Sequence, residues 1–243
     1  MSLPKIDTPL FEMNLISIDG PVTYRPFLVK EEKLMLMAIE GGDNTEILKT
    51  TKQIINNCVT GIDVENLPIF DLTFALLKIR SKSVGEVIEV VVGHPEQKNR
   101  LGDECTGTQK ISVDVSKITP TINDSHTKFI RLTDSISVEM TYPTLDLFSK
   151  MGLATDTGQV EDLFMMMTDC IDKIYSGDEI FETQDYSKKE LNDFVGSLTT
   201  EQFEKFKNFF NTMPSLTHDV EYTCPKCGQD EKITLSGLAD FFL

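Results

Sequence analysis

The sequence has no tryptophan, three histidines, five cysteines and no long apolar run. A membrane-spanning helix needs an apolar stretch of roughly 18 residues, so none is expected here. The opening segment MSLPKIDTPL lacks the charged-then-apolar pattern of a secretory signal. We therefore expect a protein that is made and kept in a cytoplasm. Five cysteines are few and odd in number, which argues against a disulfide framework.

Sequence motifs of common catalytic sites are also missing. There is no Gly-rich phosphate loop of the Walker or dinucleotide type, no Gly-x-Ser-x-Gly elbow and no His-Glu-x-x-His pattern. No feature selects one acidic pair as a glycosidase-type dyad. We expect no catalytic residue and a protein that works by binding other proteins. A hydrolase whose pocket groups a histidine with acidic residues is an alternative that the sequence leaves open.

Basic residues are scarce relative to acidic ones. The chain has 39 acidic and 23 basic residues, for a formal net charge of −16. A field of that sign repels phosphate backbones and anionic lipids, so neither nucleic acid nor a membrane is an expected partner. The charge keeps the protein soluble, or it favours docking onto a basic partner.

Hydrophobic residues make up 40% of the 243 residues, enough for a globular core. In the first third, Asp19-Gly20 predicts a hairpin and Gly41-Gly42 predicts a helix end. Asp43 with Glu46 predicts a capping box. The expected elements are strands at residues 11–18 and 22–27, then helices at 29–39, after 43 and at 69–79. The last helix is apolar nearly all round, so it is either the central core helix or a helix with one face for a partner.

Hairpins and helices alternate in the rest of the chain. Capping boxes begin two helices at Ser187 with Glu190 and at Thr199 with Gln202. The other expected elements are strands at 84–92, 111–115, 129–132, 136–140, 219–223 and 231–235, helices at 144–151 and 159–174, and a loop at 176–186. The predicted fold class is α+β: a helical core with several short antiparallel β-hairpins. We expect Cys58 and Cys170, which lie in apolar helical patterns, to be buried thiols.

Two of the predicted hairpins resemble each other. EVVVGHPEQKNRLGDECTGTQKISV (residues 89–113) and VEYTCPKCGQDEKITL (residues 220–235) each have a β-rich strand, His-Pro or Cys-Pro, a cysteine with glycine close behind, and Lys-Ile. Two similar turns can hold one ion, each giving two ligands, as in a zinc ribbon. Cys224 and Cys227 have knuckle spacing, and His94 and Cys105 are the other candidate ligands. We predict one structural zinc at these four residues.

The sequence also supports two other interpretations of these hairpins. They are ordinary turns, one of which carries reduced surface cysteines, or they form a zinc-ribbon-like adaptor that contacts nucleic acid. The adaptor would need a basic patch near the turns, and the loop 96–110 supplies only Lys98, Arg100 and Lys110.

Three stretches of the chain resemble one known family. Residues 24–33 read YRPFLVKEEK, residues 67–86 read LPIFDLTFALLKIRSKSVGE and residues 235–242 read LSGLADFF. Together with the paired hairpins they resemble the baseplate hub subunit or baseplate hub assembly proteins of T4-like bacteriophages. The likeness covers nearly the full chain, and the first two stretches are the specific ones.

The resemblance implies a late, non-enzymatic protein that acts, in a chaperone-like way, in assembling the hub of a contractile-tail baseplate. Its partners would be other hub or tail proteins, and it would reside in the infected host cytoplasm or in the finished baseplate. We expect a single domain over residues 1–243, with subregions at 1–83, 84–142 and 143–243. The expected partner-binding residues are Tyr24, Arg25, Phe27, Phe70, Phe74, Phe241 and Phe242.

Overall fold

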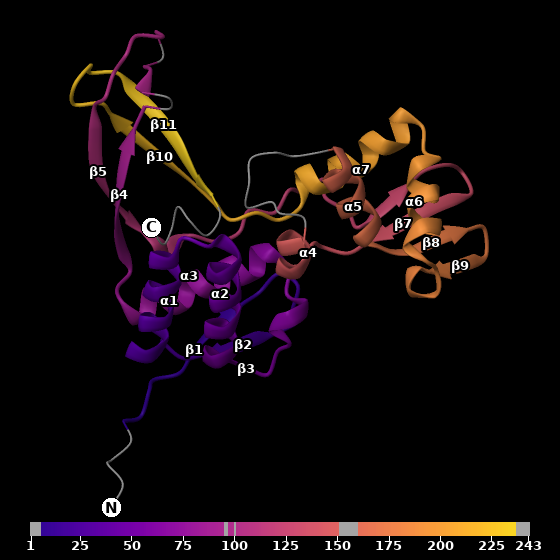
Figure 1. The fold of residues 1–243 in the computed structure, drawn as a ribbon, viewed down its shortest axis with the longest axis horizontal. Helices are drawn as coiled ribbons and strands as arrows, with labels where there is room; N and C mark the ends of the chain where they lie inside the picture. Colours follow the sequence, from indigo (N-terminus) through magenta and orange to yellow (C-terminus); the bar gives the residue numbers. More distant parts are fainter. Residues whose placement is uncertain (1–5, 95–96, 100, 151–159, 237–243) are drawn as a thin grey trace, which may run out of the picture.

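The computed structural model describes residues 6–94, 97–99, 101–150 and 160–236 of the chain. Figure 1 shows three parts: an N-terminal body, an arm that projects from the body, and a second lobe beside it. Residues 11–83 form the body, residues 87–114 and 217–236 form the arm, and residues 129–212 form most of the second lobe. The arm therefore draws on two segments that are far apart in the sequence.

The body packs helices against a small antiparallel sheet in the order β1-β2-β3. Its longest buried element is the α3 helix, in which ten residues are buried. The predicted all-round apolar helix is thus a core helix, and its burial stabilises the whole body. The elements of the body are β1 (Phe11–Asn14), β2 (Pro21–Tyr24), α1 (Val29–Gly41), α2 (Asn44–Cys58), β3 (Val59–Thr60), η1 (Val64–Asn66) and α3 (Ile69–Ser83).

One buried carboxylate ties the β1–β2 connection to α3. Asp71 is fully buried, and its two oxygens accept hydrogen bonds from the backbone N–H groups of Ile16 and Ser17, each at 2.8 Å. A buried carboxylate needs such donors, because an unpaired charge in the core would cost several kcal/mol. The predicted N-terminal hairpin is confirmed, with a longer connection than the Asp19-Gly20 pair alone.

The arm consists of two separate hairpins. The first pairs β4 (Val87–Gly93) with β5 (Thr108–Asp114), and the second pairs β10 (Thr217–Thr223) with β11 (Asp230–Ser236). Each hairpin is its own two-stranded sheet. Both hairpins were predicted from the sequence, and Figure 1 shows them side by side. The short helix η3 (Val115–Lys117) follows β5.

The second lobe has its own hydrophobic cluster, which includes Val138, Met167, Val195 and Phe206. Its antiparallel sheet has the order β6-β7-β8-β9, and the chain enters and leaves the lobe side by side, where Thr121 pairs with Ser215. The α4 helix contributes Leu145 to the body cluster and Leu147 to the lobe cluster, and so links the two. The elements are β6 (Phe129–Arg131), β7 (Ile136–Met140), α4 (Leu145–Lys150), α5 (Val160–Asp169), β8 (Ile171–Ser176), β9 (Glu179–Glu182), η4 (Thr183–Asp185), α6 (Lys188–Gly196) and α7 (Thr200–Thr212).

Two predictions in this lobe were wrong. The helix expected over residues 159–174 ends at Asp169, and residues 171–176 form strand β8. The loop expected over residues 176–186 contains strand β9. Ile171 and Ile174 fit helical spacing, but pairing with β7 and β9 determines their conformation.

The α+β fold class is confirmed: helices pack on small antiparallel sheets. Among the residues that the structure describes, no helix is long and apolar enough to cross a membrane.

Candidate metal centre

Four potential metal ligands meet between the two hairpins of the arm. They are the four residues predicted from the sequence: His94, Cys105, Cys224 and Cys227. One ligand atom from each lies within 4.8 Å of the corresponding atom of every other. The structure therefore brings the four predicted residues together, although ten residues separate His94 from Cys105 in the sequence.

Backbone geometry at the hairpin ends positions the four side chains. His94 directly follows β4, Cys105 lies shortly before β5, and Cys224 directly follows β10. Cys224 donates its N–H to the carbonyl of Gln229 at 2.8 Å, and its own carbonyl accepts from Gly228 at 2.9 Å. Gly228 has a φ of 71°, which a residue without Cβ adopts at little cost. This turn brings Cys227 back beside Cys224.

The first hairpin has a less regular turn, which likewise brings two candidate ligands, His94 and Cys105, close together. The N–H of Gln97 donates to the carbonyl of His94 at 3.1 Å, and the N–H of Cys105 donates to the carbonyl of Gln97 at 2.7 Å. Lys98 and Glu104 form an isolated antiparallel bridge across the loop. These contacts fold the long loop back, so that Cys105 returns to His94.

The distances between ligand atoms suit a tetrahedral site. The sulfurs of Cys105 and Cys224 are 3.8 Å apart, and Nε2 of His94 lies 3.3 Å from the sulfur of Cys227. Two thiolates bound at about 2.3 Å to one tetrahedral zinc would lie about 3.8 Å from each other. Three cysteines and one histidine are a common ligand set of structural zinc sites.

Two further residues shape the cluster, and no sequence motif indicated either of them. Oε1 of Glu231 lies 3.2 Å from Nδ1 of His94, whose side chain is fully buried. Gly107 leaves space for the thiol of Cys224, because a Cβ at position 107 would lie 2.5 Å from that sulfur. The Glu231 contact joins β11 to the residue that follows β4, and only the folded arm brings these two parts together.

The local electrostatics favour a thiolate at Cys224. The N–H groups of Cys227 and Lys226 lower the pKa of the Cys224 thiol to about 6. At Cys227 the N–H of Gln229 favours the thiolate, but burial and the thiols of Cys224 and Cys105 outweigh it and raise the pKa. A thiol with a low pKa is prepared to bind a cation, because the thiolate is the metal ligand.

The other two cysteines are buried thiols, as predicted. Burial raises the pKa of Cys58 to about 11 and that of Cys170 to about 12. Neither belongs to the group of metal-ligand residues found among the described parts of the chain.

The arrangement also resembles a nucleophile, base and orienting acid in the order Cys227, His94 and Glu231. Such a triad needs only one thiol, whereas three thiols converge here. The ring of His126 lies elsewhere, with Nδ1 3.0 Å from Oγ1 of Thr212 and Nε2 3.1 Å from the hydroxyl of Tyr142. The four residues together form a group that could hold one metal ion.

The predicted partner-binding residues that the structure describes lie in the body, on β2, on α3 and between β2 and α1. Tyr24, Phe70 and Phe74 are buried, and Phe27 is half-buried against the body cluster. The guanidinium of Arg25 pairs with the buried carboxylate of Glu31 at 2.9 Å. Phe241 and Phe242 lie outside the described residues. Their role in binding stays a prediction, and the buried side chains offer no free surface in this structure.

Comparison with known proteins gives a nearly full-length match. The baseplate hub assembly protein gp26 of Enterobacteria phage T4 is 22% identical over 221 residues, which cover 91% of this chain and 92% of that protein. No solved structure gives a significant match. Residues 8–243 match the family described as T4 bacteriophage base plate protein, and the chain therefore belongs to this family.

Proposed function

We propose that this chain assists the assembly of a phage baseplate hub by binding other baseplate or tail proteins. The observation that carries the proposal is the match to a baseplate hub assembly protein over 92% of that protein's length. Family membership over residues 8–243 supports it. We propose no catalytic step, because assembly by binding depends on contact surfaces. The chain would act in the infected host cytoplasm, where baseplates are built, or remain in the tail baseplate.

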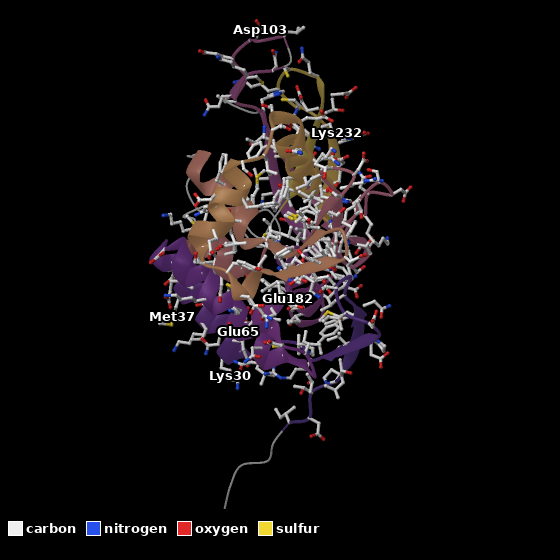
Figure 2. All side chains as sticks on the ribbon, turned by 90° about the vertical axis from the view of Figure 1, so that its right-hand side faces the viewer. Lys30, Met37, Glu65, Asp103, Glu182 and Lys232 are labelled. Carbon is white, nitrogen blue, oxygen red and sulfur yellow. The ribbon has the colours of Figure 1, made fainter. Side chains whose placement is uncertain are left out.

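An exposed apolar face on α1 supports binding to another protein. Val29, Leu36 and Met37 are 80%, 55% and 58% exposed. Val29 and Leu36 are seven residues apart and share one face of the helix, with Met37 beside them. Figure 2 labels Met37 and Lys30 at the outer surface of the body. The helix begins inside the 24–33 stretch that carries the family resemblance.

The occupant that we propose for this face is an apolar surface of a hub or tail protein. Small clusters of apolar side chains at the centre of an interface supply most of its binding free energy. The net charge of −16 would keep the free chain soluble while this face is exposed.

Co-expression with the tail proteins of its phage tests this function. The tagged wild-type chain should capture a hub or tail protein, and Leu36→Glu with Met37→Glu should weaken capture roughly tenfold or more. Ile122→Glu is the matched control, because Ile122 is 58% exposed outside α1 and should tolerate the change. Absence of any hub or tail protein with the wild type would contradict the function. Full capture by the α1 double variant would contradict only this surface.

We also propose that the metal centre of this assembly protein holds one structural zinc ion. Four protein ligands fill a tetrahedral site and leave no position for substrate, so the ion would have a structural role. The purified chain should contain about one zinc, and a chelator should expose Cys227 to alkylation. Equal alkylation of Cys227 with and without chelator would contradict zinc binding by this thiol.

A further inference from the structure

The two hairpins of the arm have little to hold them together. β4–β5 and β10–β11 are separate two-stranded sheets, and no strand pairing joins them in the described residues. An isolated two-stranded hairpin is at best marginally stable in water. The arm therefore depends on contacts between the hairpins or with the body.

Apolar contacts support the arm unevenly along its length. Near the body, Ile88, Val113 and Val220 belong to the large body cluster. Toward the outer end, the buried apolar group shrinks to Val92 and Tyr222 with two of the candidate ligands, and Val90, Ile111 and Ile233 pack partly against it. Figure 2 labels Asp103 at this outer end. The outer cluster buries far fewer large apolar side chains than the body cluster, so burial stabilises it less.

The four metal ligands lie where the apolar support is weakest. His94 and Cys105 come from the first hairpin, and Cys224 and Cys227 from the second. The contact between Cys105 and Cys224 spans 119 residues of sequence, and that between His94 and Cys227 spans 133. One ion bound here would crosslink two distant parts of the chain, and its binding free energy would become folding free energy.

We infer that zinc locks the two hairpins into one arm, and that Glu231 orients His94 toward the ion. This inference rests on the structural zinc proposed above. Oε1 of Glu231 lies 3.2 Å from Nδ1 of His94 without hydrogen-bond geometry. A small turn of either side chain on zinc binding would let the carboxylate accept the proton of Nδ1 and leave Nε2 to bind the metal. Nε2 is also the nitrogen that faces Cys227. Glu231 is thus a positioning residue that acts through His94.

Hydrogen exchange on the full-length chain tests the lock. When a chelator removes zinc, amide exchange should rise in the peptides of residues 88–94 and 220–233. The α3 and α7 peptides should stay protected, because their burial does not depend on the arm ends. Addition of zinc should restore protection of the arm. If amide exchange in the arm stayed unchanged while the zinc content fell from one ion per chain to none, zinc would not hold the two hairpins together and the inference would be overturned. Absence of zinc after reconstitution would overturn the zinc proposal itself.

Two matched carboxylate variants test the role of Glu231. Glu231→Gln should weaken zinc binding about 10- to 100-fold in competition with a chelator, and should alter the visible spectrum of the cobalt-loaded protein. Asp219→Asn is the control: Asp219 lies in the same hairpin and pairs with Lys232 at 2.7 Å, but it does not contact His94. Equal zinc affinity of Glu231→Gln and the wild type would overturn the positioning role.

Discussion

At the scale of single residues, a buried ion pair and one close backbone approach determine much of the local geometry. Glu31 is fully buried at the start of α1, where its carboxylate accepts hydrogen bonds from Arg25 at 2.9 Å and from the N–H of Leu28 at 2.7 Å. Burial alone would raise the pKa of Glu31, but these hydrogen bonds lower it below its ordinary value. The ion pair therefore fixes the entry into α1.

Removal of the Arg25 guanidinium should greatly lower the free energy of unfolding. Arg25→Met would leave the Glu31 carboxylate buried without its cation, which typically costs about 3–5 kcal/mol. Because the pKa of Glu31 is lowered in the fold, its stabilising effect is present above the ordinary glutamate pKa and is lost as pH falls through the lowered value. Urea unfolding should show a large difference in the free energy of unfolding between wild type and variant at pH 7. The difference should be smaller at acidic pH.

Lys30→Met is the control for this experiment. Lys30 lies 3.5 Å from the same carboxylate, but its side chain is 70% exposed, so its loss should cost less than about 1 kcal/mol. Equal losses of unfolding free energy in Arg25→Met and Lys30→Met would contradict the importance assigned to the buried ion pair.

The second contact concerns Gly107 beside the metal centre. Gly107→Ala should displace the thiol of Cys224, because the new Cβ would lie 2.5 Å from its sulfur and 2.8 Å from Cβ of Lys226. We expect zinc content to fall well below one ion per chain, as measured by elemental analysis. Gly196→Ala should bind zinc normally, since nothing lies within 4 Å of its added Cβ. A fully loaded Gly107→Ala protein would show that the close approach does not matter.

At the scale of elements, helix starts were the most predictable features. Thr199 Oγ1 accepts from the N–H of Gln202 at 3.3 Å, and the Gln202 side chain accepts from the N–H of Thr199 at 2.9 Å. Ser187 and Glu190 form the same reciprocal pair before α6. Such signals need only four neighbouring residues, which is why sequence alone could locate them.

The cap at Thr199 supports a direct stability prediction. Thr199→Ala should lower the free energy of unfolding by about 1 kcal/mol, because an N–H group of the first turn loses its acceptor. The adjacent Thr200→Ala should change it by less than about 0.5 kcal/mol, since Thr200 is exposed and lies inside the helix. Equal changes in the free energy of unfolding for Thr199→Ala and Thr200→Ala, measured with urea, would mean that the cap does not stabilise the protein.

Strand β8 shows why other elements could not be predicted. Cys170 still donates to the carbonyl of Met166, but from Ile171 onward the chain pairs with β7. The apolar residues there fit a helix as well as a strand, and pairing with residues 136–140 decides between them. In the same way, the paired hairpin motifs selected the four residues that the structure brings together, whereas the positions of Glu231 and Gly107 beside them depend on packing of the arm.

At the scale of the whole molecule, the chain leaves the body, forms the second lobe and then returns to the body. The body cluster takes residues from both sides of the second lobe, including Val115, Leu216 and Leu235. The pairing of Thr121 with Ser215 closes the lobe at its base, with N···O distances of 2.8 and 3.2 Å. The candidate metal centre lies on the arm built from these two returning segments. The subregions expected at 1–83, 84–142 and 143–243 stay a prediction.

The most direct test of the account is a phage from which this chain has been deleted, with its tails counted by electron microscopy. We predict that infected cells accumulate tail parts without complete baseplates, and that the chain supplied in trans restores complete tails. The Leu36→Glu, Met37→Glu double variant supplied in the same way should restore few complete tails, because its proposed partner-binding face is charged. Normal numbers of complete tails in the absence of the chain would contradict a role in hub assembly.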